Sequence, residues 1–302
     1  MEKISKILDR LEAKEDNVQA LYNIFKSVNE HGLPIIRYIL PSGTSFIRQR
    51  INESGKDYSL ISDLSYPPAD KVTKYGRANI PYNPMFYCCT FRKSAEVNST
   101  PRYVALLETS KFAKDINNSG IERATCSKWV SHKDLSLIAL PFSATYLNPC
   151  TDIKDIQQKW KEAIEIGEIN SDSLELVEYM SNEIAKPFNN GDTEYFKIAH
   201  FIYYLMRINP KTKDADGLLY PSVPAGGLGY NVVVKPEVVD KYISFENASL
   251  CYLAKKRKQM LVMNVNHAIV DNDKIIYIDD IPNKEAHEKY FNELADGLSF
   301  VN

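Results

Sequence analysis

Apolar residues near the start of the chain recur every three or four positions between Val18 and Val28, which predicts an amphipathic helix. The pattern stops at His31-Gly32, just before Pro34, because glycine and proline both end helices. We therefore predict a helical N-terminal segment over residues 1–40.

Three further helices are predicted in the middle of the chain, over residues 153–164, 172–184 and 194–208. The second begins at Asp172 and carries Glu175 three residues later, which is the spacing of a capping box. Together these segments predict a helical part over about residues 152–208.

Short apolar runs between turn residues predict strands on both sides of this helical part. The clearest ranges are Tyr103–Glu108, Asp134–Leu140, Tyr230–Lys235, Gln259–Asn266 and Lys274–Asp279, the last two joined as a hairpin. Strands, then helices, then strands, without regular β-α-β alternation, favour an α+β fold. We expect residues 41–302 to form one domain that includes the helical part.

Charge and cysteine content narrow the class of protein. The formal net charge is −2, so no global field attracts nucleic acid, and the one dense basic run, Lys255–Lys258, is interpreted as a solvated face rather than a nucleic-acid contact. The five cysteines follow no disulfide or zinc pattern, and no apolar run is long enough for a signal peptide or a membrane span. We expect a cytoplasmic protein with neither nucleic acid nor membrane as partner and without a bound metal.

Several familiar motifs are absent or explained by structure. The glycine-rich run Ala225–Tyr230 opens onto a predicted strand instead of a helix and lacks the spacing of a dinucleotide-binding loop, so a turn is the better interpretation. His200 lies within an apolar helix, and we expect a packed core residue rather than a catalytic base.

Two arginines stand on one predicted extended segment. Arg48 and Arg50 are two residues apart, so both side chains project to the same face. A pair of guanidinium groups suits a diphosphate, because each can form bidentate bonds to phosphate oxygens. Surface ion pairs with nearby acids are an equally good interpretation of this spacing.

The order of several short motifs resembles the RES family of bacterial proteins, named for an arginine, a glutamate and a serine. The chain reads "FIRQR", then "YPPADKVTKYGRANIPYNPMFYCC", then "AEV", and much later "DADGLLYPSVPAGGLGYNVVVKPEVV". These motifs cover roughly residues 46–239. The resemblance implies a fold similar to the ADP-ribosyltransferase toxins, a split β-sandwich around a cleft, here with the N-terminal helical segment and a helical insertion.

The resemblance also implies an activity. RES proteins are toxins of toxin-antitoxin pairs that deplete NAD by phosphorolysis or hydrolysis of its bond to nicotinamide. NAD would be the substrate, with phosphate or water as acceptor, and no cofactor is implied. The helical additions would serve an antitoxin interface, self-association into a homo-oligomer, or a lid.

Carried over residue by residue, the family pattern implies catalytic roles for Arg77, Tyr87 and Ser222. It implies substrate-binding roles for four further residues, Arg48, Arg50, Asn79 and Tyr220. For the glutamate we favour Glu96, which lies nine residues after Tyr87 and two short of the usual interval, because it keeps the "AEV" context. Glu108 fits an alternative alignment that contains an insertion.

The chemistry of NAD cleavage suits these residue types. Nicotinamide leaves as a neutral molecule, so catalysis depends on positioning and on stabilising the positive charge of the ribose. Two other functions use the same residues: transfer of ADP-ribose to a macromolecule, and non-catalytic binding of a nucleotide.

Overall fold

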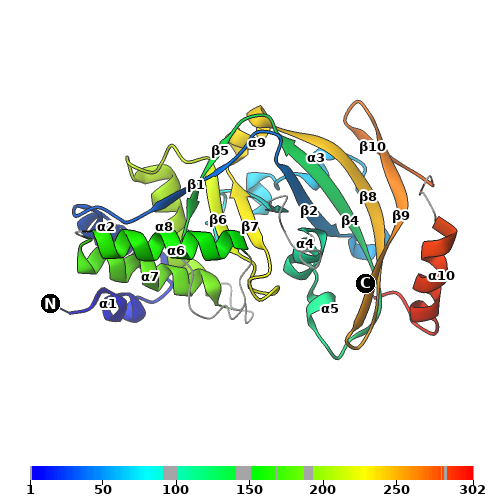
Figure 1. Ribbon diagram of the computed structural model, residues 1–302, viewed down its shortest axis with the longest axis horizontal. Helices are drawn as coiled ribbons and strands as arrows, with labels where there is room; N and C mark the ends of the chain where they lie inside the picture. Colours follow the sequence, from blue (N-terminus) through cyan, green and yellow to red (C-terminus); the bar gives the residue numbers. More distant parts are fainter. Residues whose placement is uncertain are drawn as a thin grey trace.

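The fold is that of a computed structural model, which describes residues 2–90, 101–140, 151–167, 169–186, 193–279, 281 and 284–301. Within these residues, ten strands form one mixed sheet that is combined with helices (Figure 1), so the predicted α+β class is confirmed. The strands are β1 (Ile36–Leu40), β2 (Ser45–Ile51), β3 (Phe86–Thr90), β4 (Ser119–Ser131), β5 (Leu135–Ala139), β6 (Gly217–Pro221), β7 (Tyr230–Val234), β8 (Ile243–Lys256), β9 (Gln259–Asp271) and β10 (Lys274–Ile278).

The helices of the described residues lie mainly between the strands in sequence. They are α1 (Ile4–Arg10), α2 (Val18–Asn29), α3 (Ile61–Leu64), α4 (Pro101–Thr109), α5 (Lys111–Lys114), α6 (Thr151–Ile166), α7 (Ser171–Ala185), α8 (Phe196–Tyr203), α9 (Pro236–Tyr242) and α10 (Lys284–Ala295), and a π-helical turn over Tyr204–Ile208 extends α8. In the part of the chain that is described, none of these helices has the length and apolar character needed to cross a membrane.

The sheet consists of two halves that are joined through a single residue pair. Its strand order is β1-β5-β6-β7-β3-β2-β4-β8-β9-β10, and all neighbours are antiparallel except β5 and β6. At the centre, β2 and β3 pair only through Ile47 and Cys89, whereas each pairs along its full length with its other neighbour. Figure 1 shows β6 and β7 of the first half diverging from β2 and β4 of the second.

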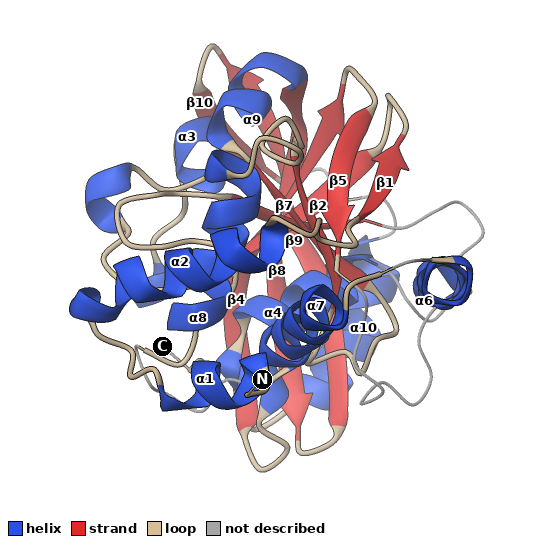
Figure 2. Ribbon diagram, turned by 90° about the vertical axis from the view of Figure 1, so that its left-hand side faces the viewer, coloured by secondary structure: helices blue, strands red, loops and turns tan. Residues whose placement is uncertain are grey.

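Helices cover both faces of the first half. One core joins α1, α2, α7 and α8 to sheet residues such as Leu218 and Val233, and another joins α6 and α9 to the opposite face through Leu219 and Val232. Figure 2 shows α6 set apart from the group of α1, α2, α7 and α8. Because β6 and β7 are buried on both faces, their sequences are apolar without alternation, apart from Asn231 in β7.

The predicted helices of the middle of the chain are confirmed as α6, α7 and α8 with its π-helical extension. The predicted capping box is wrong. The side chain of Asn170 caps α7 by accepting hydrogen bonds from the amides of Asp172 and Ser173, and Glu175 instead accepts from the amides of Ile4 and Ser5 at the start of α1. This carboxylate therefore caps a different helix and ties α1 to α7.

Two further expectations differ from the structure. The predicted strand Tyr103–Glu108 is helix α4, which buries a continuous apolar run from Val104 to Leu107 against the sheet. Residues 36–40, assigned to the N-terminal helical segment, form the edge strand β1, which pairs with β5. The strands predicted after the helical part are confirmed, including the hairpin of β9 and β10.

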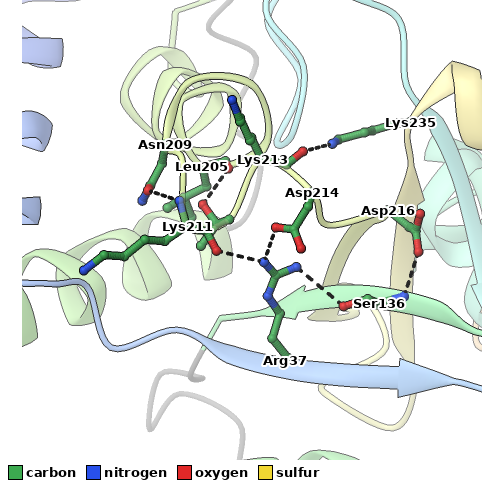
Figure 3. Close-up of polar contacts among 10 residues, drawn as sticks. Arg37, Ser136, Leu205, Asn209, Lys211, Lys213, Asp214, Asp216 and Lys235 are labelled. Carbon is green, nitrogen blue, oxygen red and sulfur yellow. Dashed lines mark hydrogen bonds and ion pairs between the residues drawn. The ribbon is translucent and has the colours of Figure 1, made fainter.

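Polar contacts fix the loop that leads into β6 (Figure 3). The carboxylate of Asp216 accepts a hydrogen bond from the Ser136 amide at 2.9 Å, which aligns β6 beside β5. Arg37 of β1 forms an ion pair with Asp214 at 2.6 Å. A Cβ atom at Gly217 would lie 2.1 Å from the carbonyl oxygen of Val233, so only glycine permits the approach of β6 to β7.

His200 is packed in the helical core, as expected. It is 4% exposed, and its two ring nitrogens lie 2.8 Å from the Tyr22 hydroxyl and 3.4 Å from the Tyr75 hydroxyl. Burial lowers the pKa of His200 to about 4, because the charged imidazolium loses its hydration.

This burial predicts a dependence of stability on pH. The pKa of His200 is lower in the folded chain than in the unfolded chain, so its contribution is complete above about pH 6.5 and is lost as the pH falls toward 4. The loss is at most about 1.4 kcal/mol per pH unit. In urea unfolding across this pH range, His200→Gln should weaken the dependence of the free energy of unfolding on pH. Exposed His31→Gln should keep the wild-type dependence. Parallel curves of the free energy of unfolding against pH for His200→Gln and wild type would contradict this account.

Candidate active site

A cleft with a volume of about 1250 Å³ opens where the two halves of the sheet diverge, and we call it the central cleft. Its walls include residues of β2, β3, α4, α5, the loop Tyr75–Asn79 and the turn between β8 and β9. Seven of the residues selected from the sequence are described, and five of them line it: Arg48, Arg77, Asn79, Tyr87 and Tyr220. Ser222 is fully buried and donates a hydrogen bond to the lining residue Glu108. Arg50 does not line the cleft, and Glu96 lies outside the described residues.

Tyr87 is held by the loop that carries the G-R-x-N motif. Its hydroxyl donates a hydrogen bond to Asn79 Oδ1 at 2.7 Å and accepts one from the Ala78 amide at 3.0 Å. Burial raises the pKa of this phenol well above its usual value. The hydroxyl is thus used to fix the loop, and the side of the ring remains in the wall of the cleft.

Glycine is required at position 76 for a steric reason. A Cβ atom at this position would lie 2.2 Å from Asn79 Oδ1 and 3.0 Å from the Tyr87 hydroxyl. The amide of Asn79 therefore occupies the space that any other side chain would need. Gly76 and Asn79 of the motif therefore both serve the contact with the Tyr87 hydroxyl.

Arg77 connects this loop to the end of a helix. Its Nη1 donates to the carbonyl oxygens of Ile184 at 2.6 Å and Lys186 at 2.8 Å, at the C-terminus of α7, where carbonyls lack helical partners. The guanidinium carbon also lies 4.8 Å from the centre of the Tyr195 ring. The side chain is 8% exposed, so its charge is held at a fixed place in the cleft wall.

Glu108 is the carboxylate that the structure brings to Ser222. The Ser222 hydroxyl and the Asn231 amide nitrogen each donate to Glu108 Oε1 at 2.7 Å. The Cys89 thiol orients Asn231 by donating to its amide oxygen at 3.2 Å. The second oxygen, Oε2, has no hydrogen-bond partner among the described residues, so this face of the carboxylate can bind a ligand.

Arg48 spans the gap between the sheet halves. From β2, its Nη1 donates to the carbonyl oxygen of Tyr87 on β3 at 2.7 Å, and its Nε donates to Leu64 at 3.1 Å. Burial, together with the neighbouring charge of Arg50, lowers the pKa of Arg48 to about 10. Arg50 projects to the same side, as predicted, but donates to the Asp63 carbonyl oxygen and lies over the Tyr58 ring.

The basic run is not simply a solvated face. Lys255 is buried, and its ammonium group donates to the carbonyl oxygens of Phe112, Ala113 and Asp115 around α5. Arg257 and Lys258 are exposed and line the outer part of the central cleft. The interpretation as a solvated face is therefore wrong for Lys255.

Comparisons of the chain with protein-family models and with curated proteins found no match. The chemistry of the site is accordingly argued from its own residues. A carboxylate with one oxygen fixed and one available, beside an arginine and several tyrosine rings, can accept hydrogen bonds from vicinal hydroxyls or stabilise a developing cation. In the described part of the chain, histidine, cysteine and carboxylate side chains form no group of three that could hold a metal ion.

Asn231 is a site residue that the sequence analysis missed. It stands between Tyr230 and the run Val232–Val234 in a strand that is otherwise apolar. A single amide side chain in a fully buried strand requires hydrogen-bond partners, and this requirement was a usable signal. Tyr195 carried no comparable signal, because aromatic residues at helix starts are common core residues.

The contact at Gly76 predicts a loss of stability. Gly76→Ala should displace the Asn79 amide and lower the free energy of unfolding by about 2 kcal/mol or more, since two hydrogen bonds to the buried Tyr87 hydroxyl are disturbed. Tyr87→Phe removes the same hydroxyl. In urea unfolding, the two substitutions together should therefore cost less than the sum of their separate effects. Strict additivity, or a stable Gly76→Ala variant, would contradict the contact.

Proposed function

We propose that this protein is an enzyme that cleaves the bond between nicotinamide and ribose in NAD, with water or phosphate as acceptor. The observation that carries the proposal is the carboxylate of Glu108, which is fixed by Ser222 and Asn231 in the same cleft as Arg77 and Tyr87. An arginine and a tyrosine from one stretch of the chain thus share a cleft with a glutamate that is bonded to a serine 114 residues further on. The divergence of the sheet at β2 and β3 supports the proposed ADP-ribosyltransferase-like architecture.

Glu108 supplies the electrostatic part of the proposed reaction. As the bond to nicotinamide lengthens, positive charge develops on the ribose, and a carboxylate oxygen nearby stabilises that charge. Because Ser222 and Asn231 both bind Oε1, the orientation of the carboxylate is set before the substrate arrives. Nicotinamide departs as a neutral molecule, so this step requires no proton donor.

We assign the family glutamate to Glu108 in place of Glu96. The reason is the direct bond between Glu108 and Ser222, which are 114 residues apart in the chain. With this assignment the interval from Tyr87 to the glutamate is longer than in the family pattern. The extra residues include the range 91–100, which lies outside the described residues.

The aromatic residues of the cleft suit the nicotinamide end of the substrate. The hydroxyl of Tyr87 is committed to the Asn79 contact, so Tyr87 would act through its ring. Tyr220 also lines the cleft, where it is 2% exposed, and burial raises the pKa of its phenol well above its usual value. Flat rings of this kind stack on a flat heteroaromatic ligand.

The arginines contribute positive charge at fixed positions. Arg77 and Arg48 each bind backbone carbonyls, so their guanidinium groups cannot move freely to enclose a phosphate. Both line the cleft, however, and a fixed charge in a site of low dielectric attracts the diphosphate without losing side-chain entropy. Arg50 has no part in this proposal, because it does not line the cleft.

Glu108→Gln is the direct test of this function. Glutamine can still accept both bonds at Oε1 but lacks the negative charge, so nicotinamide release from NAD should fall by about 100-fold or more. Glu96→Gln should change the rate by less than about fivefold, and Glu246→Gln, on the exposed part of β8, is a matched control. The measurement is chromatography of nicotinamide and the ADP-ribose product, with and without phosphate.

Two outcomes would contradict the proposal. One is intact NAD in every tube that contains folded wild-type protein. The other is full activity of Glu108→Gln together with an inactive Glu96→Gln variant, which would return the catalytic role to Glu96.

A further inference from the structure

The central cleft continues beyond Glu108 into a group of four basic side chains, which we call the cationic rim. Lys111 and Lys114 come from α5, and Arg257 and Lys258 come from the turn between β8 and β9. Among the described residues, none of these four side chains forms an ion pair or a hydrogen bond. The rim is therefore a concentration of uncompensated positive charge in a chain whose net charge is −2.

The charges of the cleft are strongly unequal. Of the described residues that line it, seven carry a positive charge and two, Glu108 and Asp115, carry a negative charge. Three of the seven, Arg48, Arg77 and Lys255, donate to backbone carbonyls and so stabilise the fold. The other four are the side chains of the rim, whose hydrogen-bond donors are available to a ligand.

The rim is built on a fixed support. The ammonium group of Lys255 binds the carbonyls of Phe112 at 2.9 Å, Ala113 at 2.7 Å and Asp115 at 2.5 Å, which holds α5 against the β8–β9 turn. The amide of Arg257 donates to the Ser119 hydroxyl at 3.1 Å, which fixes the turn itself. The four side chains thus start from two elements that are joined by hydrogen bonds.

Lys114 links the rim to the inner site. Burial lowers its pKa; the carboxylate of Glu108 raises that pKa, and the charges of Arg77 and Lys111 lower it further. Lys114 lines the same cleft as Glu108, Arg77 and Lys111, and the charges of all three act on its ammonium group. A dinucleotide with its nicotinamide ribose at Glu108 would therefore extend its diphosphate past Lys114 and its adenosine toward the rim.

The net negative charge of NAD does not match the four positive charges of the cationic rim. Its diphosphate carries two negative charges, and its nicotinamide ring carries one positive charge. A phosphomonoester on the adenosine ribose adds about 1.5 to 2 negative charges at neutral pH, because its second pKa is near 6. We propose that the cationic rim binds this 2′-phosphate, so that the cleft prefers NADP and its products over NAD. The inference rests on the proposed function for the orientation of the dinucleotide.

Binding of the products tests the rim without requiring turnover. Isothermal titration calorimetry in phosphate-free buffer should give a Kd for 2′-phospho-ADP-ribose about tenfold or more below that for ADP-ribose, since charge-assisted bonds to phosphate are strong. Arg257→Gln combined with Lys258→Gln should remove most of this difference. Lys256→Gln, at the end of β8 next to the turn but absent from the cleft lining, should preserve it. Equal Kd values for the two compounds, or binding of neither, would overturn the inference.

Turnover separates the inference from the proposed function. We expect kcat/KM for NADP to exceed kcat/KM for NAD. Arg257→Gln combined with Lys258→Gln should reduce the ratio of these two kcat/KM values. Cleavage of NAD without a preference for NADP would overturn the role of the rim and leave the proposed function standing. Tight binding of 2′-phospho-ADP-ribose without nicotinamide release from either substrate would support the rim and contradict the proposed function.

Inorganic phosphate offers the same dianion as the 2′-phosphate, and the titrations are therefore repeated with phosphate in excess. If phosphate at concentrations that support turnover abolishes the difference between the two products, the rim is a site for the phosphate acceptor, and the proposed preference for NADP is wrong. If the difference persists, the rim recognises the 2′-phosphate of the dinucleotide.

Discussion

The single residue pair between β2 and β3, Ile47 with Cys89, is the constraint on which the site depends. A continuous ladder at this point would close the sheet and leave no space for the central cleft. Arg48 takes over part of the role of the missing ladder by donating across the gap to the Tyr87 carbonyl. Arg48, one of the two arginines that suggested phosphate binding in the sequence, therefore helps to hold the two halves together.

The short motifs combine structural and chemical roles. Gly76 and Asn79 shape the loop around the Tyr87 hydroxyl, and Arg77 satisfies the C-terminal carbonyls of α7. Asp216 and Gly217 fix the start of β6, five to six residues before Ser222 reaches Glu108. Buried polar groups of this kind are costly unless they are satisfied, so their exact partners specify one geometry for the cleft.

Sequence patterns identified the long helices because α6 and α7 each show one apolar face at helical spacing. They misassigned α4, since a short apolar run such as Val104–Leu107 fits either a buried strand or a buried helix. They also missed two long strands of the second half, β4 and β8. Residues on both faces of β4 are buried in part, so its sequence does not alternate clearly.

The candidate site was predictable only in its local parts. Arg77, Asn79 and Tyr87 lie close together in sequence, and their grouping was visible there. Glu108 meets Ser222 and Asn231 from more than a hundred residues away, and neither spacing nor composition determines such a contact. For the same reason Glu175 could not be recognised as the cap of a helix 171 residues earlier in the chain.

A crystal structure of the Glu108→Gln variant soaked with NAD tests the central claim most directly. The account predicts the nicotinamide ribose within hydrogen-bond distance of the side chain at position 108, with the diphosphate directed toward Lys114. A nucleotide bound outside the central cleft, or bound with its adenosine at Glu108, would contradict it.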